Sequence, residues 1–134
     1  MANNGCSEKP KQKRKDSGYI AVDLDGTLAH YEGWKGYWKI GDPIPEMVDR
    51  VKGWLAEGKR VKIFTARMAQ HGKVMKNGRT MNIAGPIEKW CEKHLGQKLE
   101  VTNVKDMQMR ELWDDRAIQV ELNTGKIIGE PQRG

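Results

Sequence analysis

Short apolar runs that end in an acidic or hydroxyl side chain recur along this chain, and they constrain its fold more than any other feature. The runs lie at residues 19–23, 61–65 and 112–114. A continuous apolar run of this length is typical of a strand buried in a parallel sheet. Segments with helical spacing separate the runs. We therefore expect an α/β domain in which a parallel, Rossmann-like sheet is flanked by helices and built from right-handed crossovers.

Two helices are predicted between these strands. Pro45 opens a pattern of apolar residues at three- and four-residue spacing, and Gly58 follows that pattern as a helix end. Pro86 opens a second pattern, which Gly96 ends. Proline is favoured in the first turn of a helix and glycine just after its last turn. The other expected elements are a brief strand at 99–102, a helical turn at 106–110 and a C-terminal β-hairpin formed by 117–122 and 126–128.

Length and charge distribution predict one domain with an appendage. The 134 residues suit a single core, and we place that domain at residues 19–130. Residues 1–18 lack periodicity and carry five basic and two acidic residues, so they are expected to form a flexible basic arm. Such an arm either stays solvated or contacts nucleic acid through its phosphates. Within the domain we expect two loops, a flap loop at 30–43 and a basic loop at 67–83.

Features that report on cellular location point to the cytoplasm. No stretch approaches the roughly 20 apolar residues of a membrane helix, and the N-terminal residues lack the apolar segment of a secretory signal. The two cysteines, Cys6 and Cys91, have no CxxC partner, which argues against a zinc site or a disulfide framework. We therefore expect a cytoplasmic protein that does not contact a membrane.

Polar side chains follow each predicted strand. In chain order they are Asp23 and Asp25, then Thr65, then Lys105, then Asp114 and Asp115. The carboxyl ends of parallel strands meet at one edge of a sheet, where ligands bind. Carboxylates packed there without a cation repel one another, and a hard divalent cation relieves that repulsion, Mg²⁺ being usual where phosphate is also bound. A lysine and a threonine at the rim suit the oxygens of a phosphoryl group.

These residues resemble the motifs of the haloacid dehalogenase (HAD) superfamily. The sequence DLDGT at 23–27 matches the first motif, DxDGT, and Thr65 after the apolar run VKIF fits the second. Lys105 fits the third motif, and the Asp114-Asp115 pair fits the fourth. The motifs also come in the same order along the chain, which strengthens the resemblance.

The resemblance covers about residues 19–122. The stretch at 104–125 is also similar to small members of the superfamily found in phages and prophages, a likeness that says little about the substrate. The chain has no insertion long enough for a cap domain, so we expect a capless member with an open crevice. Such members accept large phosphorylated partners, and here we expect a phosphorylated small molecule or a nucleic-acid end.

The resemblance implies a role for each residue. Asp23 would be the nucleophile that forms an aspartyl-phosphate, and Asp25 would be the general acid and then the general base. The implied activity is Mg²⁺-dependent hydrolysis of a phosphate monoester. The implied metal site comprises Asp23, the backbone carbonyl of Asp25, Asp114, and Asp115, which would bind through water or orient its neighbours. The implied substrate site comprises Gly26, Thr27, Thr65, Ala66, Arg67 and Lys105, of which Thr65 and Lys105 would hold the phosphoryl oxygens.

The flap loop is rich in aromatic residues, namely Tyr31, Trp34, Tyr37 and Trp38. In the superfamily this segment covers the site, so these rings could stack a base of a nucleotide or of a nucleic-acid end. Alternatively, Trp34 and Trp38 fold back on the domain. The basic loop comes after Thr65 and is expected beside the same crevice, where Arg67 and Lys73 could steer an anionic substrate.

Other interpretations of the same residues stay open. A receiver-type phospho-acceptor also combines acids, a threonine and a lysine on a related sheet, although its threonine and lysine follow the acceptor aspartate, whereas Thr65 lies between the two acidic groups here. A catalytically weak module that binds phosphate or nucleic acid is a second alternative. Locally, Asp115 and Arg116 could instead form a surface ion pair.

Overall fold

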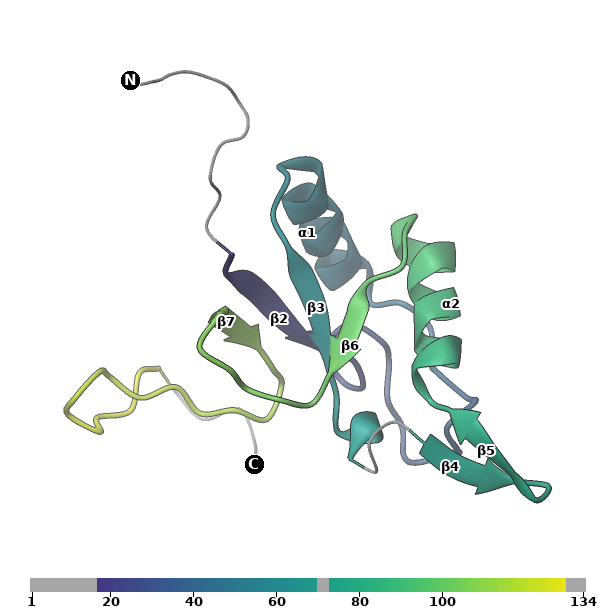
Figure 1. Ribbon diagram of the computed structural model, residues 1–134. Coiled ribbons are helices and arrows are strands. Elements are labelled where there is room, and N and C mark those ends of the chain that lie inside the picture. Colours follow the sequence, from purple (N-terminus) through teal and green to yellow (C-terminus); the bar gives the residue numbers. More distant parts are fainter. Residues whose placement is uncertain (1–16, 70–72, 130–134) are drawn as a thin grey trace.

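The computed structural model describes residues 17–69 and 73–129, and its centre is a four-stranded parallel sheet (Figure 1). The strand order is β6-β3-β2-β7. The strands are β2 (Tyr19–Asp23), β3 (Val61–Phe64), β6 (Glu100–Thr102) and β7 (Met109–Trp113). The prediction of a parallel α/β domain is therefore confirmed. Most of the predicted basic arm, residues 1–16, lies outside the described residues.

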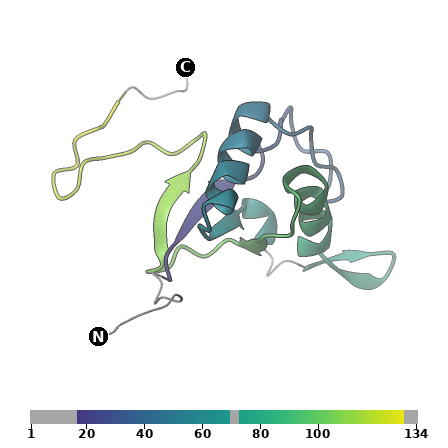
Figure 2. The ribbon, with the colours of Figure 1, turned by 90° about the horizontal axis from the view of Figure 1, so that it is seen from above.

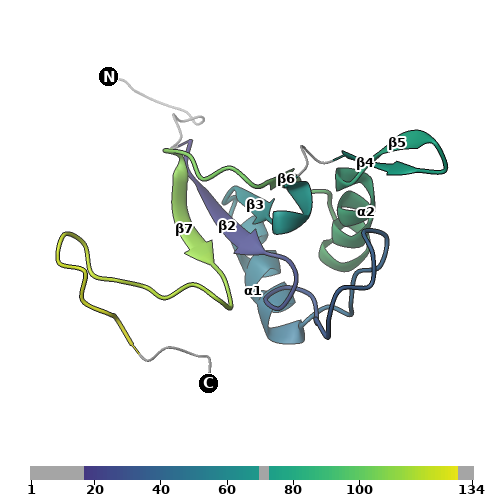
Figure 3. The ribbon, with the colours of Figure 1, turned by 90° about the horizontal axis from the view of Figure 1, so that it is seen from below.

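Two helices pack together on one side of this sheet, as the views in Figures 2 and 3 show. They are α1 (Pro45–Ala56) and α2 (Ala84–Leu95). The proline of α1 occupies its first turn, where its missing N–H costs no hydrogen bond. Gly96 ends α2 with a φ of 89°, a left-handed conformation that glycine adopts without the steric cost of a side chain. Both helices thus begin and end close to the positions that the sequence predicts.

The hydrophobic core lies between the helices and the sheet. The register pairs Ile20 with Val61 and Val22 with Ile63, so these four side chains share the face that the helices cover. The helices contribute the buried residues Met47, Val48, Val51, Ile87, Trp90, Cys91 and Leu95. Burying each large aliphatic side chain contributes about 1.5–3 kcal/mol, so this core anchors the strand ends that carry the acidic residues.

On the opposite face of the sheet, the connection from β6 to β7 contacts the first residue of β2. Tyr19 is buried on that face, and its hydroxyl donates to Asp106 Oδ1 at 3.0 Å. Asp106 Oδ1 also accepts the backbone N–H of Gln108 at 2.9 Å. This local bond competes with helix formation, which explains why the helical turn predicted at 106–110 is wrong. A tight turn occupies that position, and β7 begins at Met109, before the strand predicted at 112–114.

The predicted basic loop contains regular structure. A single 3-10 turn (Ala66–Met68) follows β3, and an antiparallel hairpin is formed by β4 (Lys73–Lys76) and β5 (Arg79–Asn82). Between the two strands, Asn77 and Gly78 have φ angles of 53° and 76°. An Asn-Gly pair with positive φ at both positions is the preferred two-residue hairpin turn. The prediction of an irregular loop over 67–83 is therefore wrong for its second half.

The C-terminal segment turns back on itself without forming strands. The predicted β-hairpin is reduced to one bridge between Val120 and Ile127, supported by a bond from the Glu121 N–H to the Lys126 carbonyl at 2.7 Å. Figure 1 shows this segment extending away from the sheet. Its aliphatic side chains at 118, 120, 122, 127 and 128 are exposed, so no core stabilises a longer ladder. In the described part of the chain, no helix is both long and apolar enough to cross a membrane.

Candidate active site

The parallel register brings the ends of three strands to one edge of the sheet. Asp23, the last residue of β2, pairs with Phe64 at the end of β3. On the other side, Val22 pairs with Trp113 at the end of β7. Thr65 and Asp114 directly follow these strands. The sequence-predicted side chains from all three strands therefore meet at one place, although they are far apart along the chain.

Three carboxylates form a cluster at this edge. Asp23, Asp114 and Asp115 each place one carboxylate oxygen within 4.8 Å of the others. Burial, a hydrogen bond with Asp115 and the charges of Asp114, Asp115 and Asp25 together raise the pKa of Asp23 to about 8. In the described part of the chain, no lysine or arginine forms an ion pair with these three carboxylates. Oxygen ligands at this spacing fit a hard divalent cation such as Mg²⁺, and among the described residues no other such group of acids forms.

Gly26 and Thr27 shape the cluster from the loop after β2. Gly26 has a φ of +93°, and a Cβ there would lie 2.7 Å from Asp115 Oδ2, so a side chain would meet both strain and a carboxylate. The Thr27 hydroxyl oxygen accepts the backbone N–H of Asp115 at 2.9 Å. The same hydroxyl donates to Asp115 Oδ1, also at 2.9 Å. These contacts join the first and last motifs. They fix Asp115, while the predicted contact of both residues with substrate stays a prediction.

Thr65 is fixed by the turn that follows it. Its side chain is buried, and its Oγ1 accepts the backbone N–H of Arg67 at 3.1 Å. Its own N–H donates to the Thr102 carbonyl at 2.9 Å. A threonine that caps a turn in this way has a defined hydroxyl position. Thr65 and Ala66 both line the cleft described below.

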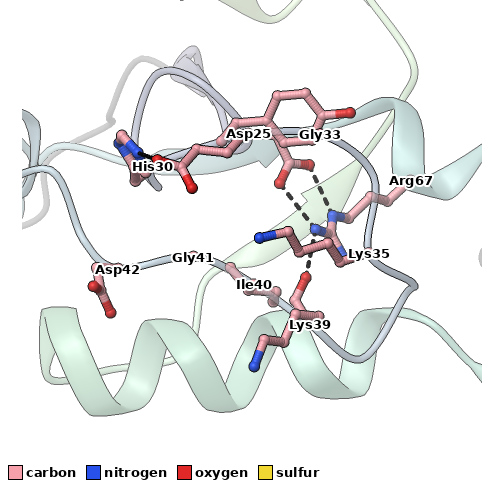
Figure 4. Close-up of a pocket in the computed structure, with 11 residues that line it drawn as sticks. Asp25, His30, Gly33, Lys35, Lys39, Ile40, Gly41, Asp42 and Arg67 are labelled. Atoms are coloured by element: carbon pink, nitrogen blue, oxygen red, sulfur yellow. Dashed lines mark hydrogen bonds and ion pairs between the residues drawn. The ribbon is translucent and has the colours of Figure 1, made fainter.

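Asp25 does not join the acidic cluster through its side chain. The Arg67 guanidinium donates to both of its oxygens, from Nε to Oδ2 at 2.8 Å and from Nη2 to Oδ1 at 2.9 Å. Arg67 is 6% exposed, and Figure 4 shows its planar end facing the Asp25 carboxylate. Such bidentate pairs are the strong charge-assisted ones. The sequence assigned Arg67 to the substrate and missed this pair, since nothing in either motif indicates it. The metal contact expected of the Asp25 carbonyl stays a prediction.

The cluster opens into a cleft of about 530 Å³. The residues lining it are Asp23, Asp25, Tyr31, Trp34, Phe64, Thr65, Ala66, Arg67, Ala69, Asn103, Asp114, Asp115 and Arg116. Two of the four flap aromatics, Tyr31 and Trp34, therefore face the cleft, and Trp34 is half exposed. Tyr37 packs against the core instead. Within the flap loop, Tyr31 and Trp34 therefore line the cleft, whereas Tyr37 anchors the loop to the domain.

Two residues predicted at the site lie elsewhere, and the cleft is also lined by residues that were not predicted there, Asn103 and Arg116 among them. Lys105 is exposed on the β6–β7 connection and does not line the cleft, where Asn103 is found instead. Lys73, at the start of β4, is also absent from the described lining residues. Arg116 does line the cleft, and its backbone N–H donates to Asp114 Oδ1 at 2.7 Å. In the described structure, Arg116 forms no ion pair with Asp115, so that sequence-based alternative is wrong. The phosphate role of Lys105 stays a prediction.

A second, smaller cavity of about 310 Å³ lies within the flap loop (Figure 4). It shares Asp25, Tyr31 and Arg67 with the cleft, so these three residues form the wall between the two spaces. Its far side is polar, with His30 Nε2 3.0 Å from Glu32 Oε2. The Asp25–Arg67 pair therefore lines both spaces.

Comparison with known proteins leaves the site to be interpreted from its own geometry. No family model and no curated protein matches the chain. A solved structure described as a conserved protein coded by a locus from Bacteroides thetaiotaomicron matches with 22% identity and a TM-score of 0.49. That match covers 83% of this chain and 81% of the other. At this level of similarity, no activity is carried over from that protein.

Proposed function

We propose that this protein is a capless phosphohydrolase of the HAD type that cleaves phosphate monoesters in the presence of Mg²⁺. The single observation that carries the proposal is the convergence of Asp23, Asp114 and Asp115 on one cleft. Thr65, the hydroxyl expected from the second motif, lines the same cleft. The geometry brings residues of three of the four superfamily motifs to this cleft, and Lys105, from the third motif, does not line it.

The first chemical step uses the two aspartates of the DLDGT motif. An Asp23 carboxylate oxygen attacks phosphorus, so that a P–O bond to Asp23 forms while the P–O bond to the leaving group breaks. Asp25, in its protonated form, donates a proton to the departing oxygen, and Arg67 pairs with the carboxylate form that acts as the base in the second step. In the second step, water attacks the aspartyl-phosphate, the bond to Asp23 breaks, and Asp25 takes the proton from that water. The product is inorganic phosphate, and both aspartates return to their starting form.

The remaining residues bind and orient. A Mg²⁺ ion held by Asp23, Asp114 and Asp115 would reduce the repulsion between the nucleophile and the phosphate dianion. Thr65 lines the cleft and would donate its hydroxyl to a phosphoryl oxygen, and Thr27 holds Asp115 in position. Tyr31 and Trp34 line the cleft and offer aromatic surfaces for stacking a base. We therefore favour a nucleotide or a nucleic-acid terminal phosphate as substrate.

The proposal is tested with phosphorylated metabolites, nucleotides and oligonucleotides that carry a 3′- or a 5′-phosphate. Each is assayed for phosphate release with Mg²⁺ and with a chelator. We expect release only with the metal, and we expect Asp23→Asn to lower kcat by about a thousandfold or more while the circular dichroism spectrum is unchanged. Asp49→Asn, an exposed aspartate on α1, is the matched control and should retain full activity.

Three outcomes would contradict the proposal. Normal turnover by Asp23→Asn would exclude Asp23 as the nucleophile. Binding of phosphate or oligonucleotide without any turnover across the panel would favour the catalytically weak binding module. Incorporation of a stable phosphoryl group on Asp23 would instead favour a phospho-acceptor.

A further inference from the structure

We infer that Arg67 is a positioning residue that fixes the Asp25 carboxylate and couples the flap loop to it. The inference deepens the proposed function and rests on it, because the positioned group is the proposed acid and base. It also replaces the expectation from sequence that Arg67 binds the substrate.

All five N–H groups of the guanidinium have protein acceptors. Two of them donate to Asp25, as described above. The other three are directed to flap-loop carbonyls, namely Lys39 at 2.9 Å, Tyr37 at 3.0 Å and Gly36 at 3.5 Å. An arginine has five donors and no more. A phosphoryl group could therefore gain an Arg67 donor only by breaking one of these bonds.

Both the backbone and the side chain of Arg67 are held in place. The backbone of Arg67 is fixed because its N–H donates to Thr65 Oγ1 at 3.1 Å, and its side chain is almost fully buried. The planar fork of arginine matches the two oxygens of a carboxylate. Asp25 is therefore held at a defined angle beside the cleft, and β3 supplies the rigid support.

The same guanidinium also binds the flap loop. Besides the three carbonyls, the Trp34 ring lies 4.9 Å from the Arg67 guanidinium carbon. Loop and carboxylate therefore share one anchor, as Figure 4 shows for Asp25 and Lys39. If the anchor is altered, the orientation of Asp25 and the order of the loop should change together.

A positioning role predicts a dependence on the leaving group. Proton donation by Asp25 matters most for a poor leaving group such as an alkoxide, and little for p-nitrophenolate, which departs without a proton. A phosphate-binding role would affect both equally, because the phosphoryl group is the same. Glycerol phosphate and p-nitrophenyl phosphate therefore separate the two roles.

The test uses Arg67→Lys, which keeps the positive charge and removes the fork. We expect kcat/KM for glycerol phosphate to fall about thirtyfold or more, kcat/KM for p-nitrophenyl phosphate to fall less than about threefold, and inhibition by inorganic phosphate to change little. The ratio kcat/KM is compared because it reports the step in which the leaving group departs, whereas the later hydrolysis of the aspartyl-phosphate needs Asp25 for both substrates. Asp25→Asn should show the same selectivity, and the double variant should lose no more than Asp25→Asn alone. Arg60→Lys is the matched control, since Arg60 also donates from Nε and Nη2 to one carboxylate, Glu100, but is exposed. It should leave both rates unchanged.

A second measurement does not depend on activity. Amide hydrogen exchange across residues 30–43 should accelerate in Arg67→Lys and in Asp25→Asn, and by no more in the double variant than in the faster single one. The inference is overturned if exchange is unchanged. It is also overturned if kcat/KM falls equally for both substrates and inhibition by inorganic phosphate becomes weaker. Were the wild type inactive on every substrate, the proposed function would fail, while the exchange experiment would still decide whether Arg67 couples Asp25 to the loop.

Discussion

The two halves of the DLDGT motif meet opposite electrostatic surroundings. Asp23 faces Asp114 and Asp115, and its burial, its hydrogen bond with Asp115 and the surplus of negative charge raise its pKa to about 8. Asp25, two residues later, faces a buried guanidinium that donates to both of its oxygens. One carboxylate is left uncompensated by the protein, and the other is fully paired within it.

This difference shows how two aspartates that are close in sequence can have different properties. A carboxylate among other carboxylates gains most from an external cation, and such a site is suited to binding one. A carboxylate locked by a bidentate arginine gains orientation instead. β2 ends at Asp23, and Asp25 lies in the turn that follows, so each side chain can have its own partners.

The largest expected effect on stability comes from breaking the paired half. Arg67→Met would leave the Asp25 carboxylate without its partner and would remove the donors from three carbonyls. Because removal of one member of a buried pair is costly, we expect the free energy of unfolding to fall by about 3 kcal/mol, measured by urea denaturation. Arg60→Met removes an exposed pair with Glu100 and should cost less than about 1 kcal/mol. If the free energy of unfolding fell equally in the two variants, the Asp25–Arg67 pair would be no more important for stability than the exposed pair.

The uncompensated half is tested by its affinity for Mg²⁺. Asp114→Ala removes one of three clustered oxygens, and we expect the Kd for Mg²⁺ to rise by about tenfold or more, a change of about 1.4 kcal/mol, in titration calorimetry. Asp49→Ala on α1 controls for the loss of an acidic residue outside the cluster. An unchanged Kd in Asp114→Ala would exclude Asp114 from the metal site.

The smallest expected effect is a dependence of stability on pH in metal-free protein. The pKa of Asp23 in the fold is raised above its ordinary value of 3.8 to about 8, so the folded state holds this proton more tightly than the unfolded state. The resulting stabilisation is complete below about pH 4 and is lost as the pH rises through about 8. We expect a loss on the order of 1 kcal/mol, since solvent screens a partly exposed group. Thermal melts at several pH values should show this decline, and Asp23→Asn should flatten it.

Adding Mg²⁺ to the same thermal melts tests whether the cluster binds a cation. At about pH 8 a bound cation should stabilise the wild type and have little effect on Asp23→Asn, because binding to the folded state alone raises stability. A wild-type melting temperature that is independent of pH, in metal-free buffer, would argue that the charges of the cluster do not interact.

Much of the fold could be predicted because its signals are local. The proline at the start of α1 and the glycine after α2 act within one helical turn. The Asn77-Gly78 pair is equally local, and the hairpin that it forms lies in a segment expected to be irregular because of its polar, glycine-punctuated composition. The bond from Asp106 to the Gln108 N–H is also local, yet it competes with a helical pattern of similar strength. Helix and turn signals of comparable energy are settled by packing, and here Tyr19 adds the contact that favours the turn.

The chemistry at the ends of β2, β3 and β7 can be read from residue order, because parallel strands necessarily bring their carboxyl ends to one edge. The partners of Asp25 could not be read in this way. Arg67 is 42 residues away in sequence, and its direction depends on a buried turn and on carbonyls of a loop without regular structure. Likewise, Asn103 and Arg116, not Lys105, line the cleft. Sequence order specifies which backbone positions converge, whereas the direction of each side chain follows from the packing of distant segments.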